Sequence, residues 1–342
     1  MRVPVVSMSG KPLMPTTPCR ARKMVRSGVA KKCWNQLGVF YIQMVRPVGE
    51  VVQDMALAID PGSKYDGYAV ASEKETQLCG MTVLPDKVKD KMKNRHEMRR
   101  TRRYRNTRRR KCRFSNRQRK EGWIAPSQLA KVQLRLKIAS ELCQIFPIKH
   151  IVVEDVRFNH YQKKWGKFFS TVEIGKTRLY SELEQLGKLF LLEGWQTKKA
   201  RDYYGITKCS QKDKLIKESH ANDAIAMCCE LYQKKVDSLS PFYVWRRFEF
   251  VRRSLHRQNF QKGNIRPNFG GTTNGTFFRK GDYVEASQGK KTFRGWVCGL
   301  PTEKTNVIAV CNAFGKRFGQ CSTSKVNLLS RNTGVSWQFL PD

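Results

Sequence analysis

Short apolar segments separated by turn residues open the main hydrophobic pattern of the chain. Residues 55–59 are apolar throughout, and residues 66–71 contain a second apolar run after the turn dipeptide Pro61-Gly62. Segments of this length with turn residues between them are typical of two buried strands in a hairpin. Residues 77–84 predict a third strand, and residues 38–45 predict an earlier one.

Helical spacing appears next. Apolar residues three or four positions apart predict a first helix, which Pro147 ends and for which Ser127 is a candidate cap. Its apolar positions are Leu129, Val132, Leu136, Ala139 and Cys143. Residues 148–156 then form a short apolar segment that ends in acidic residues, which predicts a buried strand.

A second helix, a further strand and a third helix follow. The second helix has an apolar face made of Leu179, Leu183, Leu186 and Phe190, and Gly194 lies just past its expected end. Residues 195–204 predict a strand. The third helix lies around residues 218–228, where apolar positions recur at helical spacing: Ala221, Ala224, Ile225 and Cys228.

The resulting order is three strands, a helix, a strand, a helix, a strand and a helix, which is the order of an RNase H-like α/β fold. Asp60 ends the first hairpin strand, Glu154 ends the later strand, and Asp223 lies in the last helix. A carboxylate leaving a buried strand is costly to place unless it is paired or binds a metal. Asp60 alone is equally consistent with a residue that opens a turn, so its two acidic counterparts favour a site.

Three converging carboxylates can hold two divalent metal ions that cleave a phosphodiester, one activating water and the other stabilising the leaving oxygen. Hard oxygen ligands without thiolates favour Mg²⁺, with Mn²⁺ as a substitute. His220 precedes Asp223 by three residues, so we expect both side chains to project together from one helix. His220 is then a candidate general base, and a purely structural histidine is the alternative.

The most unusual composition lies between residues 87 and 120. Of these 34 residues, 18 are Lys or Arg, and only Asp90 and Glu97 oppose them. Like charge at this density requires phosphates to neutralise it. Good helix formers without Gly or Pro predict an internal basic helix along nucleic acid, and a disordered tail or a localisation signal is the alternative. The candidate binding residues are Arg95, Arg99, Arg100, Arg102, Arg103, Arg105, Arg108, Arg109, Arg110, Arg113, Arg117 and Arg119.

The composition of the whole chain indicates a polyanionic partner. Its 342 residues carry a formal net charge of +38, from 66 Lys+Arg against 28 Asp+Glu. The absence of a signal peptide and of any apolar run near 18 residues predicts a cytoplasmic protein with no membrane partner. The 11 cysteines form no Cys-x-x-Cys pair, which favours reduced thiols over a zinc site.

Both ends of the chain predict separate modules. Residues 1–50 are basic, and their Pro12, Pro15 and Pro18 predict an arm without a helix or a long strand, laid on a phosphate backbone or solvated. Residues 241–276 combine a basic segment with a linker rich in Gly and Asn. Residues 277–342 show short strands with Gly turns, which predicts a small β-barrel.

Taken together, these motifs resemble the RuvC-type nuclease domains of transposon-encoded RNA-guided nucleases (OMEGA systems) and of CRISPR type II effectors. The three split motifs of that family are similar to Ile59-Asp60-Pro61-Gly62-Ser63, Val153-Glu154-Asp155 and Ser219-His220-Ala221-Asn222-Asp223-Ala224. Lys11-Pro12-Leu13-Met14-Pro15 resembles the PLMP motif of IscB and IsrB proteins. IscB carries an HNH nuclease between its second and third motifs, whereas residues 155–219 are too few to hold one. The resemblance is therefore to IsrB, the HNH-lacking form.

The resemblance implies an α/β fold in which an arginine-rich bridge helix splits an RNase H-like (RuvC) nuclease domain. Its divisions are a PLMP region at 1–50, RuvC segments at 51–86 and 122–240, the bridge helix at 87–121, a basic segment and linker at 241–276, and a barrel at 277–342 that recognises a target-adjacent motif. Asp60, Glu154, His220 and Asp223 would be catalytic, with the three acids binding two Mg²⁺ ions.

By the same resemblance, a long noncoding guide RNA pairs with the target strand of double-stranded DNA, and the protein nicks the displaced strand. The protein would act as a monomer within a ribonucleoprotein, in a prokaryotic cytoplasm. The alternatives are a guide-independent, structure-selective nuclease of the RuvC type and a non-catalytic RNA-binding protein.

Overall fold

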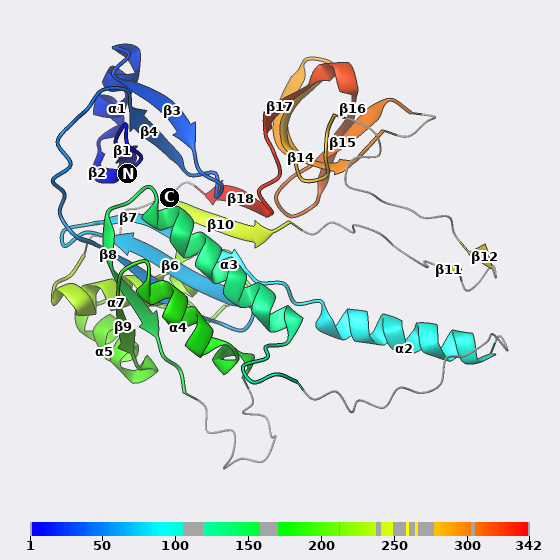
Figure 1. The fold of residues 1–342 in the computed structure, drawn as a ribbon, viewed down its shortest axis with the longest axis horizontal. Helices are drawn as coiled ribbons and strands as arrows, with labels where there is room; N and C mark the ends of the chain where they lie inside the picture. Colours follow the sequence, from blue (N-terminus) through cyan, green and yellow to red (C-terminus); the bar gives the residue numbers. More distant parts are fainter. Residues whose placement is uncertain are drawn as a thin grey trace. The chain divides into compact units, whose positions relative to one another are not determined.

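The computed structural model describes residues 2–104, 119–157, 170–211, 213–236, 241–248, 258–259, 264–265, 277–301 and 305–340. The chain divides into two compact units, which are described separately (Figure 1). The first unit comprises Met1–Leu84, Ala130–Phe248 and Thr333–Asp342, and the second comprises Pro85–Leu129 and Glu249–Asn332. Within the described part of the chain, none of the helices has the length and apolar character needed to cross a membrane.

The first unit is built on a seven-stranded mixed sheet. Its strands, in order across the sheet, are β18 (Val335–Leu340), β10 (Phe242–Arg247), β7 (Thr76–Val83), β6 (Tyr65–Ala71), β5 (Met55–Asp60), β8 (Ile148–Glu154) and β9 (Lys188–Leu192). Strands β5, β6 and β7 form an antiparallel meander, whereas β8 and β9 run parallel to β5. The meander confirms the predicted hairpin and third strand.

Helices cover this sheet. They are α3 (Pro126–Cys143), the short 3₁₀ helix η1 (Thr171–Glu173), α4 (Lys176–Glu184), α5 (Gly194–Tyr204), α6 (Lys217–His220) and α7 (Asn222–Tyr232). Because successive strand residues face opposite sides, Leu57 and Ile59 join α3 and α4 in one core cluster. The small residues Ala56 and Ala58 face the other way, and α7 packs closely on β5 and β6. Ser127 is the second residue of α3, so its assignment as a cap is wrong.

The region after α4 differs from the prediction by one element. The predicted second helix ends at Glu184, and residues 188–192, which include Phe190, form the parallel strand β9. Gly187 allows this turn, because a Cβ there would lie 2.8 Å from the carbonyl oxygen of Lys149 on the neighbouring strand. Residues 195–204, predicted as a strand, belong to helix α5, which ends at Gly205 in the left-handed conformation.

Two strands from the distant end of the chain complete the large sheet. Strand β10 lies in a stretch that sequence composition described only as basic, and it pairs in parallel with β7. Strand β18, which the sequence placed among the C-terminal strands, pairs with β10. Trp245 of β10 is fully buried, and its indole N–H donates to the Leu37 carbonyl at 3.1 Å. These pairings extend the sheet beyond the meander.

The basic N-terminal stretch is a folded module within the first unit, so the expectation of an arm without a helix is wrong, whereas the strand expected at residues 38–45 is confirmed as β4. A four-stranded sheet in the order β2-β1-β4-β3 packs with one helix. Its elements are β1 (Val3–Val6), β2 (Pro12–Thr16), α1 (Pro18–Arg26), β3 (Ala30–Trp34) and β4 (Phe40–Met44). Pro12 and Pro15 are tolerated because β2 is an edge strand, and Pro18 occupies the first turn of α1 after the Thr17 cap.

The second unit contains α2 (Val88–Tyr104) and a five-stranded antiparallel sheet in the order β16-β15-β14-β13-β17. The bounds of its elements are β11 (Gln258–Asn259), β12 (Asn264–Ile265), β13 (Tyr283–Gln288), β14 (Lys291–Gly299), β15 (Val307–Cys311), β16 (Arg317–Ser322), the 3₁₀ helix η2 (Thr323–Lys325) and β17 (Val326–Ser330). Val284, Val297 and Val310 share its core. No ladder joins β16 to β17 among the described residues, so the five strands expected to form a small barrel pair there as an open sheet.

Candidate active site

Three acidic residues lie near one edge of the large sheet. Asp60 ends β5, and Glu154 ends the neighbouring parallel strand β8, with Ile59 paired to Val153 just before them. Parallel neighbours end at the same edge, which brings these two carboxylates together. Asp223 lies in the first turn of α7, which packs on the same strands.

The pKa of Asp60 is shifted by burial and by the two other acids. Burial raises its pKa well above the usual range, and the nearby charges of Glu154 and Asp223 raise it further. Lys208 acts in the opposite direction and lowers that pKa. The structure therefore places the three predicted acids within one electrostatic environment.

Asp223 is the most constrained of the three. Lys208 forms an ion pair with its Oδ2, and Nε of Arg201 lies 3.0 Å from its Oδ1. The second contact lacks hydrogen-bond geometry, so Oδ1 is buried without a donor. A buried carboxylate oxygen that accepts no hydrogen bond can still bind a cation.

The donor set suits a hard divalent cation in its chemistry, since it consists of carboxylate oxygens and includes the orphaned Oδ1 of Asp223. Among the described residues, no three His, Cys, Asp or Glu side chains are already grouped closely enough to hold a metal ion. Asp223 is paired instead with Lys208 and Arg201, so binding an ion would require Asp223 to exchange these partners.

A buried ion pair, which the sequence analysis missed, holds the turn that follows Asp60. Arg135 of α3 donates from Nε to Oδ2 of Asp66 at 2.9 Å and from Nη2 to Oδ1 at 2.8 Å. The same Nη2 donates to the Gly62 carbonyl at 2.8 Å, and the Gly62 N–H donates to Asp66. Lys131 adds a hydrogen bond to the Ser63 carbonyl. The sequence did contain a signal for this pair, since Asp66 and Arg135 are charged residues within apolar patterns.

Gly67 brings the third acid into place. It is the strand partner of Asp60, and a Cβ added to it would lie 1.8 Å from the His220 carbonyl oxygen. The backbone between α6 and α7 can therefore approach β6 only because residue 67 has no side chain. This approach positions Asp223, three residues further along.

His220 lies differently from the prediction. It ends α6, and Ala221 separates it from α7, so His220 and Asp223 do not share one continuous helix. The imidazole packs against the Tyr65 ring, with the ring centres 4.7 Å apart and the planes tilted by 50°, and its Nε2 lies 3.1 Å from the Lys214 carbonyl. Because a carbonyl only accepts, Nε2 carries the proton in this contact.

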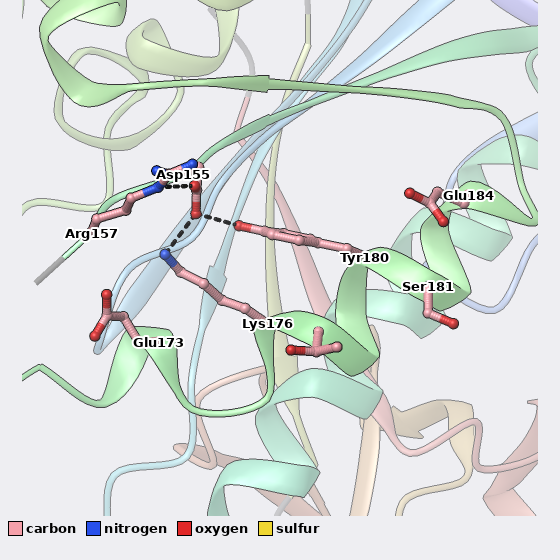
Figure 2. Close-up of a pocket in the computed structure, with 8 residues that line it drawn as sticks. Asp155, Arg157, Glu173, Lys176, Tyr180, Ser181 and Glu184 are labelled. Carbon is pink, nitrogen blue, oxygen red and sulfur yellow. Dashed lines mark hydrogen bonds and ion pairs between the residues drawn. The ribbon is translucent and has the colours of Figure 1, made fainter. Parts of the chain in front are cut away.

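Asp155, next to Glu154, forms a separate polar cluster (Figure 2). Burial would raise the pKa of Asp155, but hydrogen bonds from Lys176 (2.7 Å), Arg157 (2.9 Å) and Tyr180 (2.9 Å) outweigh it and lower that pKa to about 2. Asp155 is the first residue after β8, and two of its partners, Lys176 and Tyr180, lie on α4. The cluster borders an open pocket of about 570 Å³ and holds the chain as it leaves β8.

The predicted basic helix is confirmed over Val88–Tyr104, and it carries eight Lys or Arg and two acids. Arg95, Arg99 and Arg100 have exposed side chains, and the backbone of Arg102 and Arg103 lies in the same helix. The Arg119 guanidinium lies 3.8 Å from the centre of the Trp123 ring. The other predicted arginines lie outside the described residues: Arg105, Arg108, Arg109, Arg110, Arg113 and Arg117.

Comparison with known proteins gives a family. A family model described as RRXRR protein matches residues 3–174, half of the chain, and the matched region contains Arg99-Arg100-Thr101-Arg102-Arg103. The chain therefore belongs to the RRXRR protein family. No curated protein matches it in sequence.

Similarity to solved structures is low. T. thermophilus RuvC in complex with a Holliday junction substrate is 13% identical, with a TM-score of 0.30, and the match covers 53% of this chain and 94% of that one. A second Thermus thermophilus RuvC structure is 13% identical, with a TM-score of 0.27 and coverage of 52% and 93%. At TM-scores this low, the similarity by itself defines neither the fold nor the activity of this chain.

Proposed function

We propose that this protein is a divalent-metal-dependent DNA endonuclease that nicks one strand under the direction of a guide RNA. The observation that carries the proposal is the placement of Asp60 and Glu154 at the shared end of the parallel strands β5 and β8, with the charge of Asp223 acting on Asp60 from α7. The sheet order β7-β6-β5-β8-β9, an antiparallel meander followed by parallel strands, supports an RNase H-like fold of the RuvC type.

The residues divide the work of such a site. Asp60, Glu154 and Asp223 would hold two Mg²⁺ ions, and the bound ions supply water activation and stabilisation of the leaving oxygen. Arg135 and Asp66 keep the turn after Asp60 in place, and Gly67 sets the approach of α7. His220 would act as the general base. We expect His220→Ala to slow nicking without weakening DNA binding.

The guide RNA is proposed from the surface of the second unit. Helix α2 exposes every side chain that the structure describes in it, and its eight Lys or Arg outnumber its two acids. Phosphates of a long noncoding RNA would supply the balancing negative charge. Base pairing would select the target strand, and the five-stranded sheet is the proposed reader of the adjacent DNA motif.

The test is nicking of a supercoiled plasmid by the full-length protein, with the RNA that copurifies with it and Mg²⁺. We expect an open-circular product that disappears with EDTA and in Asp60→Asn, Glu154→Gln and Asp223→Asn. Glu182→Gln is the matched control, since Glu182 is a surface acid paired with Arg178 on α4. Mainly linear product would contradict a single cleavage centre.

Two further outcomes would replace the proposal. Cleavage of four-way junctions by RNA-free protein would indicate a guide-independent, structure-selective nuclease. Unchanged behaviour with and without Mg²⁺, together with tight RNA binding, would indicate a non-catalytic RNA-binding protein. Sequencing of the copurified RNA identifies the guide needed for the plasmid assay.

A further inference from the structure

Helix α5 connects two of the three acids. At its first residue, Gly194, an added Cβ would lie 3.5 Å from Oε1 of Glu154. Two turns later, Arg201 on the same helix lies 3.0 Å from Asp223. The helix therefore runs beside the proposed cleavage centre. Gly194 lies next to the Glu154 carboxylate, and the residue after Gly194 is its immediate neighbour in the chain.

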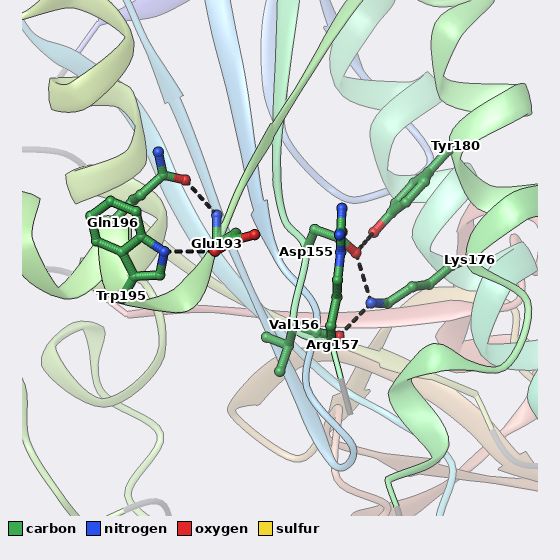
Figure 3. Close-up of polar contacts among 8 residues, drawn as sticks. All are labelled: Asp155, Val156, Arg157, Lys176, Tyr180, Glu193, Trp195 and Gln196. Carbon is green, nitrogen blue, oxygen red and sulfur yellow. Dashed lines mark hydrogen bonds and ion pairs between the residues drawn. The ribbon is translucent and has the colours of Figure 1, made fainter. Parts of the chain in front are cut away.

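That next residue, Trp195, is unusually exposed and is held in a fixed position (Figure 3). Its side chain is 61% exposed, although Trp is a costly residue to leave in water. The indole N–H donates to Oε2 of Glu193 at 2.6 Å. Gln196 anchors the same turn, because its Oε1 accepts from the Glu193 N–H at 2.8 Å. A large aromatic face is thus preorganised at the edge of the site.

The rest of the exposed face of α5 matches this aromatic platform. Lys198 and Lys199 follow at helical spacing and are exposed. Tyr203, two turns from Trp195, is 81% exposed and packs edge-to-face on Tyr204 at 4.9 Å. Asp202 is the one acid on this face of the helix. Aromatic rings interleaved with lysines are the pattern that binds single-stranded nucleic acid, through base stacking and phosphate contacts.

We propose that the exposed face of α5, from Trp195 to Tyr203, binds the single DNA strand that is to be cut, with a base stacked on Trp195. The inference deepens the proposed function and depends on it for the choice of DNA. Lys198 and Lys199 contact phosphates along the helix. Trp195 is a substrate-binding residue that orients the strand so that its phosphate reaches the three acids.

The stacking is tested with full-length protein and a short single-stranded DNA that carries the fluorescent base 2-aminopurine, whose emission falls when it stacks on an aromatic ring. We expect quenching with wild-type protein and with Trp195→Phe. Trp195→Ala should lose the quenching and bind the strand about 5- to 150-fold more weakly. The matched control is Trp34→Ala, because Trp34 is an indole of similar exposure in the N-terminal module.

A second measurement separates this inference from the proposed function. In the plasmid assay, Trp195→Ala should raise KM far more than it lowers kcat, and Trp195→Phe should restore most of the loss. If nicking requires Asp60, Glu154 and Asp223 but Trp195→Ala changes neither nicking nor quenching, only the α5 site is overturned. Quenching that requires Trp195 in a protein without nicking activity overturns the nuclease and leaves the α5 site standing.

An RNA strand of the same sequence gives the last comparison. Weaker binding of the RNA, with less quenching by Trp195, supports the assignment to DNA. Tighter binding of the RNA than of the DNA overturns that assignment. Quenching equal in wild type and Trp195→Ala overturns stacking on Trp195 for either strand.

Discussion

The pair formed by Asp66 and Arg135 shows how single residues prepare the site. Both side chains are almost completely buried, and together they fix both the carbonyl and the N–H of Gly62, two residues after Asp60. A buried ion pair adds little net stability over an apolar replacement, but the loss of one partner leaves an uncompensated charge. Its value here is that it specifies the geometry of the turn.

We expect Arg135→Met to lower the free energy of unfolding by about 3–5 kcal/mol, because Asp66 would remain buried without its partner. Chemical denaturation of the full-length protein measures the change. Arg178→Met is the control, since it breaks the exposed pair with Glu182 and should cost at most about 1 kcal/mol. Equal effects of the two substitutions would contradict the role assigned to the buried pair.

Asp155 supports a prediction of pH dependence. Its pKa of about 2 lies below the usual value, so its contribution to stability is complete above about pH 4 and is lost as the pH falls through 2. We expect Asp155→Asn to be less stable than wild type by about 1–2 kcal/mol at pH 6, because the substitution removes the charge that Lys176 and Arg157 stabilise. The loss stays this small because the surrounding pocket is open to water, which screens the charges. The difference should shrink between about pH 4 and pH 2, as measured by denaturation at each pH. A difference that stays constant would show that the ionised form is not favoured in the fold.

At the scale of elements, the position of α7 depends on a glycine in β6. Strand β6 has no side chain at Gly67, where the backbone of His220 crosses. Ala221, which precedes α7, and Ala224 of α7 are fully buried and small. Close packing of this kind depends on each of these residues remaining small, since an added methyl group has no free volume to occupy.

We therefore expect Gly67→Ala to shift α6 and α7, to destabilise the protein by about 1–3 kcal/mol and to reduce nicking by about 10²-fold while RNA binding is kept. Thermal unfolding, filter binding and the plasmid assay provide the three measurements. Gly49→Ala is the matched control, because a Cβ at Gly49 would meet no atom within 4 Å. Full activity in Gly67→Ala would contradict the proposed placement of Asp223.

For the whole molecule, the dominant feature is a formal net charge of +38. If the protein covers about 6 to 10 phosphates, nonspecific affinity for nucleic acid should fall by roughly 10³- to 10⁵-fold between about 50 and 200 mM salt. The slope of log affinity against log salt concentration should fall in magnitude by about one for each single substitution, Arg95→Ala, Arg99→Ala or Arg100→Ala. Titration at several salt concentrations measures this slope. Lys74→Ala, on the exposed turn between β6 and β7, is the comparison. A flat salt response would contradict phosphate binding.

The sequence by itself determined the hairpin and third strand of the large sheet, the strand ends at Asp60 and Glu154, and the helical segment that begins near residue 88. These features depend on local patterns: apolar period, turn residues and charge density within a few positions. The same patterns could not distinguish β9 from the end of α4, because a short apolar run such as residues 188–192 fits either structure until a neighbouring strand pairs with it.

Only the tertiary structure decided the rest. The parallel pairing of β10 with β7, the edge position of β2 that tolerates Pro12 and Pro15, and the approach of His220 to Gly67 are contacts between residues distant in the sequence. The neighbourhood of Asp60, Glu154 and Asp223 is of the same kind, since more than 60 residues separate each acid from the next. The physical reason is that pairing, close approach and electrostatic coupling depend on distance in space, which no local pattern specifies.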